Sequence, residues 1–300
     1  MESTKSVEDM YPPKQYNPLG RSANNDDKLW LFDRLKRYGE FTGMTWLLSP
    51  EPDKENNLPI QTVEEIILSD EFVESGLNTQ FLLEKLKITE RKVREVVAVT
   101  ENQRESDAWH MLRKGRLTAS NFGPVLESKR VTPSLVKRVL GEYDVSRVQA
   151  VSWGIVNEKE GIKAFTNYTK LPVQHTGLWL HTSGVLGASP DGLVGSDAVL
   201  EVKCPFTQRN ATIAEALECK NFCLEKKGQG YALKKSSHYW HQVQGQMYIT
   251  GRNICYFVVW TTKESAILPI QKDPTWEENI LHLQDFYTLN MIPALVDGGL

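Results

Sequence analysis

The stretch Ser189-Pro190-Asp191-Gly192, followed a short interval later by Leu200-Glu201-Val202-Lys203-Cys204-Pro205, decides the fold. Side chains alternate along a strand, so Glu201 and Lys203 would share one face of a strand over residues 198–204, and its other face would be apolar. Pro-Asp-Gly is typical of a turn. The two segments together therefore predict a hairpin that brings Asp191 beside this strand.

The pairing of Glu201 with Lys203 in an otherwise apolar strand has two explanations. A surface strand with an ordinary Glu–Lys pair is the simpler one. The alternative is a buried pair, which costs several kcal/mol unless partners compensate for the lost hydration. Two carboxylates beside one lysine can hold a divalent metal ion and position a water molecule, as phosphodiester hydrolysis requires. The Pro-Asp-Gly turn at this distance favours the second explanation.

Composition excludes several classes of protein. The chain has 300 residues, of which 40% are hydrophobic and 24% are charged, as in ordinary globular proteins. No apolar stretch is long enough to span a bilayer, and the N-terminus lacks the apolar core of a signal peptide. The 4 cysteines are too few for a disulfide framework. We therefore expect no membrane association and an intracellular location, nuclear in a eukaryote and otherwise cytoplasmic.

The net charge of −3 conceals two basic segments. Residues 104–147 hold 9 Lys and Arg against 5 Asp and Glu, and residues 203–235 hold 7 against 3. Basic segments on either side of the Asp191 and Glu201 region are consistent with contacts to a phosphate backbone. Solvated surface charge is the alternative explanation.

The order of patterns along the chain predicts three parts. Residues 1–27 are polar and rich in proline, which is typical of a disordered leader. Residues 28–103 have short helical patterns and form an N-terminal extension of unknown role. Residues 104–300 alternate helical and strand patterns, which predicts an α/β catalytic domain with a central mixed β-sheet flanked by helices. Within it, residues 211–224 are expected to be helical.

Two predicted helices carry polar residues of interest. Glu158 falls inside the apolar stripe of a helix over residues 146–166, so it lies at a rim or points toward a charged group. The helix over residues 239–250 carries Gln242, Gln244 and Gln246. Gln242 and Gln244 lie about 200° apart around a helix, so only one of the two can face the site fully.

Several motifs in this order resemble the lambda-phage exonuclease and YqaJ-type viral recombinase family of the PD-(D/E)XK nuclease superfamily. They span residues 104–262 and are Asp107-Ala108-Trp109-His110 with both Leu112-Arg113 and Leu117-Thr118-Ala119-Ser120, then Trp153-Gly154 with Glu158, then Ser189-Pro190-Asp191-Gly192, then Leu200-Glu201-Val202-Lys203-Cys204-Pro205-Phe206-Thr207 with Arg209, and last Tyr239 with Gln242-Val243-Gln244. Five ordered matches are specific where one alone would be weak.

The resemblance implies a restriction-endonuclease-like core and a role for each matched residue. Asp191 and Glu201 would bind Mg²⁺, with Mn²⁺ as a substitute, helped by Glu158 and the backbone carbonyl of Val202. Lys203 would orient the attacking water, with Gln242 nearby. The residues that would bind DNA phosphates, including the 5′-terminal one, are Arg113, Ser120, Ser189 and Arg209.

The activity implied is a 5′→3′ exonuclease that acts on double-stranded DNA ends in recombination or end processing. A single-strand annealing protein as partner and a homo-oligomer follow from the resemblance alone. Two alternatives stay open at this stage. One is an endonuclease, or an exonuclease of other polarity, from the same superfamily. The other is a non-catalytic DNA-binding or interaction protein that retains the fold.

Overall fold

The computed structural model describes residues 24–37, 44, 48, 58–141 and 148–298. The chain divides into two units, residues 1–57 and 58–300. The first unit contains helix α2 (Asn25–Lys36), which begins within the last residues of the predicted leader, residues 1–27. A reciprocal pair of hydrogen bonds between Asn24 and Asp27 caps this helix. Of the predicted leader, residues 1–23 lie outside the described residues.

The second unit begins with short helices that share one kind of N-terminal cap. They are α4 (Val63–Ile67), α5 (Asp70–Glu74), α6 (Thr79–Leu86) and α7 (Glu90–Val99), capped by the side chains of Thr62, Ser69, Asn78 and Thr89. Their apolar residues, such as Phe72 and Leu82, belong to the same core as Leu117 and Leu186. Residues 58–103 therefore pack into one unit with the strands and helices that follow.

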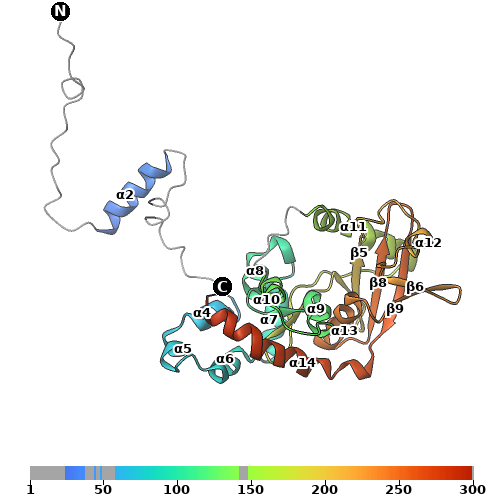
Figure 1. The fold of residues 1–300 in the computed structure, drawn as a ribbon. Helices are drawn as coiled ribbons and strands as arrows, with labels where there is room; N and C mark the ends of the chain where they lie inside the picture. Colours follow the sequence, from blue (N-terminus) through green and yellow to red (C-terminus); the bar gives the residue numbers. More distant parts are fainter. Residues whose placement is uncertain (1–23, 38–43, 45–47, 49–57, 142–147, 299–300) are drawn as a thin grey trace, which may run out of the picture. The chain divides into compact units, whose positions relative to one another are not determined.

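A mixed four-stranded sheet forms the centre of this unit (Figure 1). Its strands, in spatial order, are β4 (Gly192–Val194), β5 (Ala198–Lys203), β8 (Ile254–Trp260) and β9 (Ser265–Gln271). β5 pairs with β4 and runs parallel to β8, with Glu201 opposite Phe257. β8 and β9 form the antiparallel hairpin that completes the sheet. β5 is therefore paired on both edges, as expected for a strand that carries a buried site.

Helices cover the two faces of this sheet, as predicted. On the Val199 face, α13 (His238–Thr250) contributes Val243 and Met247 to a common core. On the opposite face, Leu200 and Val202 pack with Phe165 of α11 (Gln149–Thr169). The expected α/β fold, with a mixed sheet flanked by helices and a largely helical N-terminal region, is confirmed.

The other elements complete the described part of the chain. They are η1 (Gln103–Glu105), α8 (Asp107–Arg113), β1 (Leu117–Thr118), η2 (Ala119–Asn121), α9 (Phe122–Leu126), α10 (Pro133–Leu140), β2 (Trp179–Leu180), β3 (Leu186–Ala188), α12 (Ile213–Ala216), β6 (Leu224–Lys227), β7 (Gly230–Leu233), η3 (Pro274–Trp276), α14 (Asn279–Phe286), η4 (Tyr287–Met291) and α15 (Ile292–Val296). β1, β3 and β2 form a second, three-stranded sheet in that spatial order.

One prediction of secondary structure is wrong. Residues 211–224 were expected to be helical throughout, but α12 is only four residues long, and Leu224 already belongs to β6. β6 pairs with β7 as an antiparallel hairpin. The buried residues Leu224 and Leu233 lie opposite each other in this hairpin and pack into the core on the Val199 face of the main sheet. This packing stabilises two strands in place of a longer helix.

Gly161 allows α11 to approach β5 closely. A Cβ atom at Gly161 would lie 2.3 Å from Cγ1 of Val202, closer than two carbon atoms can approach. The absence of a side chain therefore sets the spacing between helix and strand. Glu158, one turn earlier on the same helix, is brought near the strand that carries Glu201 and Lys203.

Among the described residues, no helix is long and apolar enough to span a membrane.

Candidate active site

The hairpin formed by β4 and β5 places Asp191 beside the Glu-x-Lys strand. The backbone N–H of Asp191 donates to Leu200 O at 3.0 Å, and the N–H of Val202 donates to Asp191 Oδ2 at 2.7 Å. Nε2 of Gln103 donates to the carbonyl of Pro190 at 2.8 Å and supports the turn. The predicted position of Asp191 across the hairpin is confirmed.

Glu201 is the most enclosed acidic residue of the site, with only 2% of its surface exposed. Lys203 Nζ forms an ion pair with Glu201 Oε1. Nε2 of Gln242 donates to the same oxygen at 2.6 Å, and Nε2 of Gln246 donates to Oε2 at 2.6 Å. Donors on both oxygens compensate for the lost hydration of this carboxylate and fix its orientation.

Glu158 reaches the site from the neighbouring helix. Its side chain is 28% exposed, and Oε2 lies 3.3 Å from Nη2 of Arg104 in an ion pair. This agrees with the prediction that an acidic residue in the apolar stripe of this helix lies at a rim or points toward a charged group.

The carboxylates and the lysine of the site shift one another's pKa values. Burial raises the pKa of Asp191 well above its ordinary value, and the negative charges of Glu201 and Glu158 raise it further. Burial also raises the pKa of Glu158, although Arg104 opposes this shift. Burial alone would lower the pKa of Lys203, but Glu201 and Asp191 outweigh it, so the net shift is upward. Lys203 is therefore a protonated donor at neutral pH.

Arg113 presents an unsatisfied cation to the same site. Its guanidinium carbon lies 3.8 Å from the centre of the Trp109 ring, and its buried Nε has no hydrogen-bond partner among the described residues. Burial and the nearby charge of Arg104 lower the pKa of Arg113 to about 10, so it is still charged at neutral pH. Trp109 Nε1 donates to Ser189 Oγ at 2.9 Å, which holds the ring in place.

These residues line one cavity, which we call the central pocket. Its volume is about 440 Å³. The sequence-predicted residues that line it are Arg113, Ser120, Glu158, Ser189, Asp191, Glu201, Val202, Lys203 and Gln242. They come from segments far apart in the chain, including α8, η2, α11, the β4–β5 hairpin and α13. The structure thus brings nine of the ten predicted site residues together.

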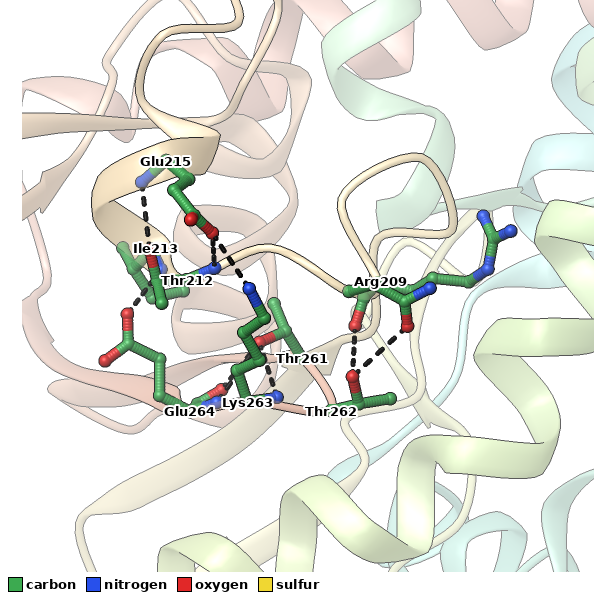
Figure 2. A network of polar contacts seen from close by, with 9 residues as sticks. Arg209, Thr212, Ile213, Glu215, Thr261, Thr262, Lys263 and Glu264 are labelled. Carbon is green, nitrogen blue, oxygen red and sulfur yellow. Dashed lines mark hydrogen bonds and ion pairs between the residues drawn. The ribbon is translucent and has the colours of Figure 1, made fainter.

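Arg209 is the predicted site residue that does not line the central pocket. Its backbone carbonyl accepts hydrogen bonds from the N–H and the Oγ1 of Thr262, both at 2.9 Å, which ties its loop to the turn between β8 and β9. Figure 2 shows the Arg209 side chain extending away from that network. Nη1 of Arg209 donates to Phe206 O at 2.7 Å, and the guanidinium lies 4.2 Å from the Phe206 ring centre.

Gln246 is a site residue that the sequence interpretation did not single out. It lies one helical turn after Gln242 and is 1% exposed, and its Oε1 has no partner among the described residues. The spacing of four residues, which places both side chains on one face of a helix, was the available signal. Gln244 points elsewhere, because its amide bonds to Gln271 O and to the N–H of Asp273.

The donor set of the central pocket fits a divalent metal ion. Asp191, Glu201 and Glu158 offer hard carboxylate oxygens. Among the described residues, however, no group of three or more His, Cys, Asp or Glu side chains is arranged as a complete metal site.

The fold and the site together resemble one class of protein. A mixed sheet with Asp191 and Glu201-x-Lys203 beside each other, flanked by helices that carry Glu158 and Gln242, is similar to the PD-(D/E)XK nuclease arrangement. The more specific resemblance is also confirmed, since residues 108–253 match the family model of the YqaJ-like viral recombinase domain.

Several known proteins are similar to this chain. The alkaline nuclease of Autographa californica nuclear polyhedrosis virus is 24% identical over 199 residues, which cover 60% of this chain and 47% of the relative. That of Orgyia pseudotsugata multicapsid polyhedrosis virus is 26% identical over 203 residues, which cover 59% and 46%. This chain therefore spans about half the length of these relatives. An alkaline exonuclease structure from Laribacter hongkongensis is 25% identical, with a TM-score of 0.47, covering 64% of this chain and 95% of that chain.

Proposed function

We propose that this protein is a metal-dependent DNA nuclease that acts inside cells, and specifically a 5′→3′ exonuclease on the ends of duplex DNA. The observation that carries the proposal is the convergence of Glu158, Asp191, Glu201 and Lys203 on the central pocket, with Arg113 at the same cavity. The alkaline nuclease relatives and the YqaJ-like match support the same class.

The residues of the central pocket have complementary roles in this proposal. Asp191 and Glu201, with Glu158 and the carbonyl of Val202 as further donors, would hold a divalent ion, which would supply Lewis acidity at the reacting phosphate. Gln242 and Gln246 hold Glu201 in one orientation through their 2.6 Å hydrogen bonds. Lys203 is protonated, so it donates a hydrogen bond to the attacking water or to a phosphate oxygen. We propose Mg²⁺ as the ion, with Mn²⁺ as a substitute.

The specificity for a 5′ end rests on Arg113 and Ser120. A buried guanidinium whose Nε lacks a partner among the described residues is suited to bind a phosphate oxygen. Ser120 lines the same pocket and offers a hydroxyl donor. Arg209 would contact a phosphate farther from this pocket. A single-strand annealing protein and a homo-oligomer are the partners that the resemblance implies.

Digestion of labelled DNA tests the proposed function directly. Linear duplex labelled at either the 5′ or the 3′ end, and a covalently closed circle, are incubated with Mg²⁺. We expect early release of the 5′ label and an intact circle. Cleavage of the circle would instead support an endonuclease, and early release of the 3′ label the opposite polarity. Activity no higher than that of the Asp191→Asn variant would leave a non-catalytic DNA-binding protein.

Replacement of Arg113 tests the recognition of the 5′ phosphate. Loss of a charge-assisted hydrogen bond costs about 1.5–3 kcal/mol, so Arg113→Ala should slow digestion of 5′-phosphorylated ends by roughly 10- to 100-fold. Ends with a 5′ hydroxyl should be affected little. Lys114→Ala is the matched control, because this neighbouring cation pairs with Glu64 and does not line the pocket. Equal losses on both kinds of end would refute the assignment.

A further inference from the structure

A second cavity, of about 650 Å³, adjoins the central pocket. We call it the basic groove. The residues that border both cavities are Ser120, Ala150, Pro205, Cys223 and Tyr239. Because the two spaces share these walls, a chain molecule seated with one residue in the central pocket can continue into the groove.

The charges of the basic groove have one sign. The residues that line it include Arg138, Lys220, Lys234 and His238, and none is Asp or Glu. His238 pairs with Glu127 at 3.2 Å, whereas Arg138, Lys220 and Lys234 have no carboxylate partner among the described residues. Within the described part of the chain, Lys234 Nζ donates only to the carbonyl of Lys220, at 3.2 Å. Three cations are therefore available to an anionic ligand.

The two basic segments of the sequence meet at this groove. Arg138 lies on α10, within residues 104–147, and Lys220 and Lys234 belong to residues 203–235. These segments are far apart along the chain, and neither provides the groove alone. A surface that gathers positive charge from both has the character of a polyanion site rather than of a solvated helix face.

Aromatic rings lie among these cations. Tyr239 is 37% exposed, and its ring centre is 5.0 Å from Lys203 Nζ, so it links the groove to the lysine of the central pocket. Phe206 lines the groove, with the Arg209 guanidinium over its ring. Hydroxyl donors are present at Thr207, Ser236 and Ser237. Aromatic rings beside cations, such as the exposed Tyr239 and the half-buried Phe206, are typical of sites that bind a single strand, whose unpaired bases can stack on them.

We propose that the basic groove binds the unpaired stretch of the DNA strand that is continuous with the nucleotide in the central pocket. Arg138, Lys220 and Lys234 neutralise its phosphates, and Tyr239 stacks on a base where the strand passes between the two cavities. This proposal rests on the proposed nuclease function for the identity of the polyanion. It adds a path for several nucleotides beyond the site of hydrolysis.

Binding measured without turnover tests this path. The intact protein is titrated, in buffer with EDTA, against a fluorescent single-stranded dT12 oligonucleotide and against a blunt hairpin duplex. Lys220→Ala/Lys234→Ala removes two groove cations. Lys226→Ala/Lys227→Ala is the matched control, because these exposed lysines belong to the same basic segment but do not line the groove. Melting temperatures confirm that both variants are folded.

We expect the groove variant to bind dT12 about tenfold more weakly at low salt. The slope of log binding constant against log salt concentration should be shallower by about 1.4, which is about 0.7 for each lost phosphate contact. The control should bind within about twofold of the wild type. Equal losses in both variants would overturn the proposal, since general attraction would then suffice. A loss seen with the duplex but not with dT12, or displacement of dT12 by millimolar inorganic phosphate, would also overturn it. Because no hydrolysis is involved, failure here is distinct from failure of the digestion assay.

Discussion

The central pocket and the basic groove share Tyr239 and Ser120, yet their charges are organised in opposite ways. In the central pocket every acidic group has an internal partner. Glu201 has three, namely Lys203, Gln242 and Gln246. In the basic groove the lysines have no carboxylate partner among the described residues. The difference follows from burial, because a buried carboxylate needs partners that offset its lost hydration, whereas an exposed cation can be satisfied by water.

This contrast separates two roles that DNA processing requires. Internal partners fix the carboxylates in the geometry needed for metal and phosphate, while burial raises the pKa values of Asp191 and Glu158. Unpartnered cations leave the groove free to bind any backbone, and to release it. The central pocket is therefore suited to chemistry at one phosphate, and the basic groove to sequence-independent contact with a strand.

The same substitution made in each cavity gives the largest expected effect. Lys203→Met should lower the rate of hydrolysis by about 10³-fold or more, because the donor to the attacking water or phosphate is lost in a buried site. Affinity for dT12 should change little. Lys234→Met should do the reverse, with weaker binding and a rate at saturating DNA near that of the wild type. Initial rates at several DNA concentrations measure both. Similar kinetic defects in the two variants would erase the distinction between the cavities.

A smaller effect is expected at Gln246. Gln246→Met keeps the volume of the side chain but removes the donor to Glu201 Oε2, so the carboxylate is held from one side only. Loss of a group that orients a metal ligand typically costs 10- to 100-fold, and we expect about tenfold, seen as a higher Mg²⁺ concentration for half-maximal rate. Gln244→Met is the control, because its bonds to Gln271 and Asp273 hold the helix to β9. It should lower the melting temperature without changing the Mg²⁺ requirement.

The core of the site could be predicted because its signals are local. Alternation within residues 198–204 fixes which side chains share a face, and Pro-Asp-Gly fixes a turn, so Asp191, Glu201 and Lys203 follow from a few neighbouring residues. Glu158 was visible as a charge inside an apolar helical stripe. These predictions hold in the folded protein because the geometry of a strand or a helix determines which of its side chains share a face.

The remainder depended on contacts between distant segments. The hairpin of β6 and β7 forms where apolar residues pack into the core on the Val199 face of the main sheet. The sequence of residues 211–224 alone does not indicate that core. The role of Gln246 depends on how α13 lies against β5, which brings Nε2 within 2.6 Å of Glu201. The basic groove likewise exists only because residues 104–147 and 203–235 fold together. Sequence patterns do not indicate these distances directly.

The smallest expected effect is a dependence of stability on pH and metal in the central pocket. The fold raises the pKa of Asp191 above its ordinary value of 3.8, so its protonated form is favoured. Its contribution to stability is complete below pH 3.8 and is lost as the pH rises through the raised value. Asp191→Asn removes this loss. In EDTA at pH 8, the variant should therefore melt about 2–6 °C above the wild type, and the gap should close toward pH 4.

Added Mg²⁺ should reverse this order, because the ion binds the folded wild type and offsets the repulsion between carboxylates. The groove variant Lys220→Ala/Lys234→Ala serves as the comparison. Its melting temperature relative to the wild type should not depend on pH between 4 and 8 or on Mg²⁺, because no carboxylate lines the groove. If Asp191→Asn melts below the wild type at pH 8 in EDTA, the carboxylate stabilises the fold as it stands. The pocket would then not be poised for a metal ion by the repulsion of its acidic groups.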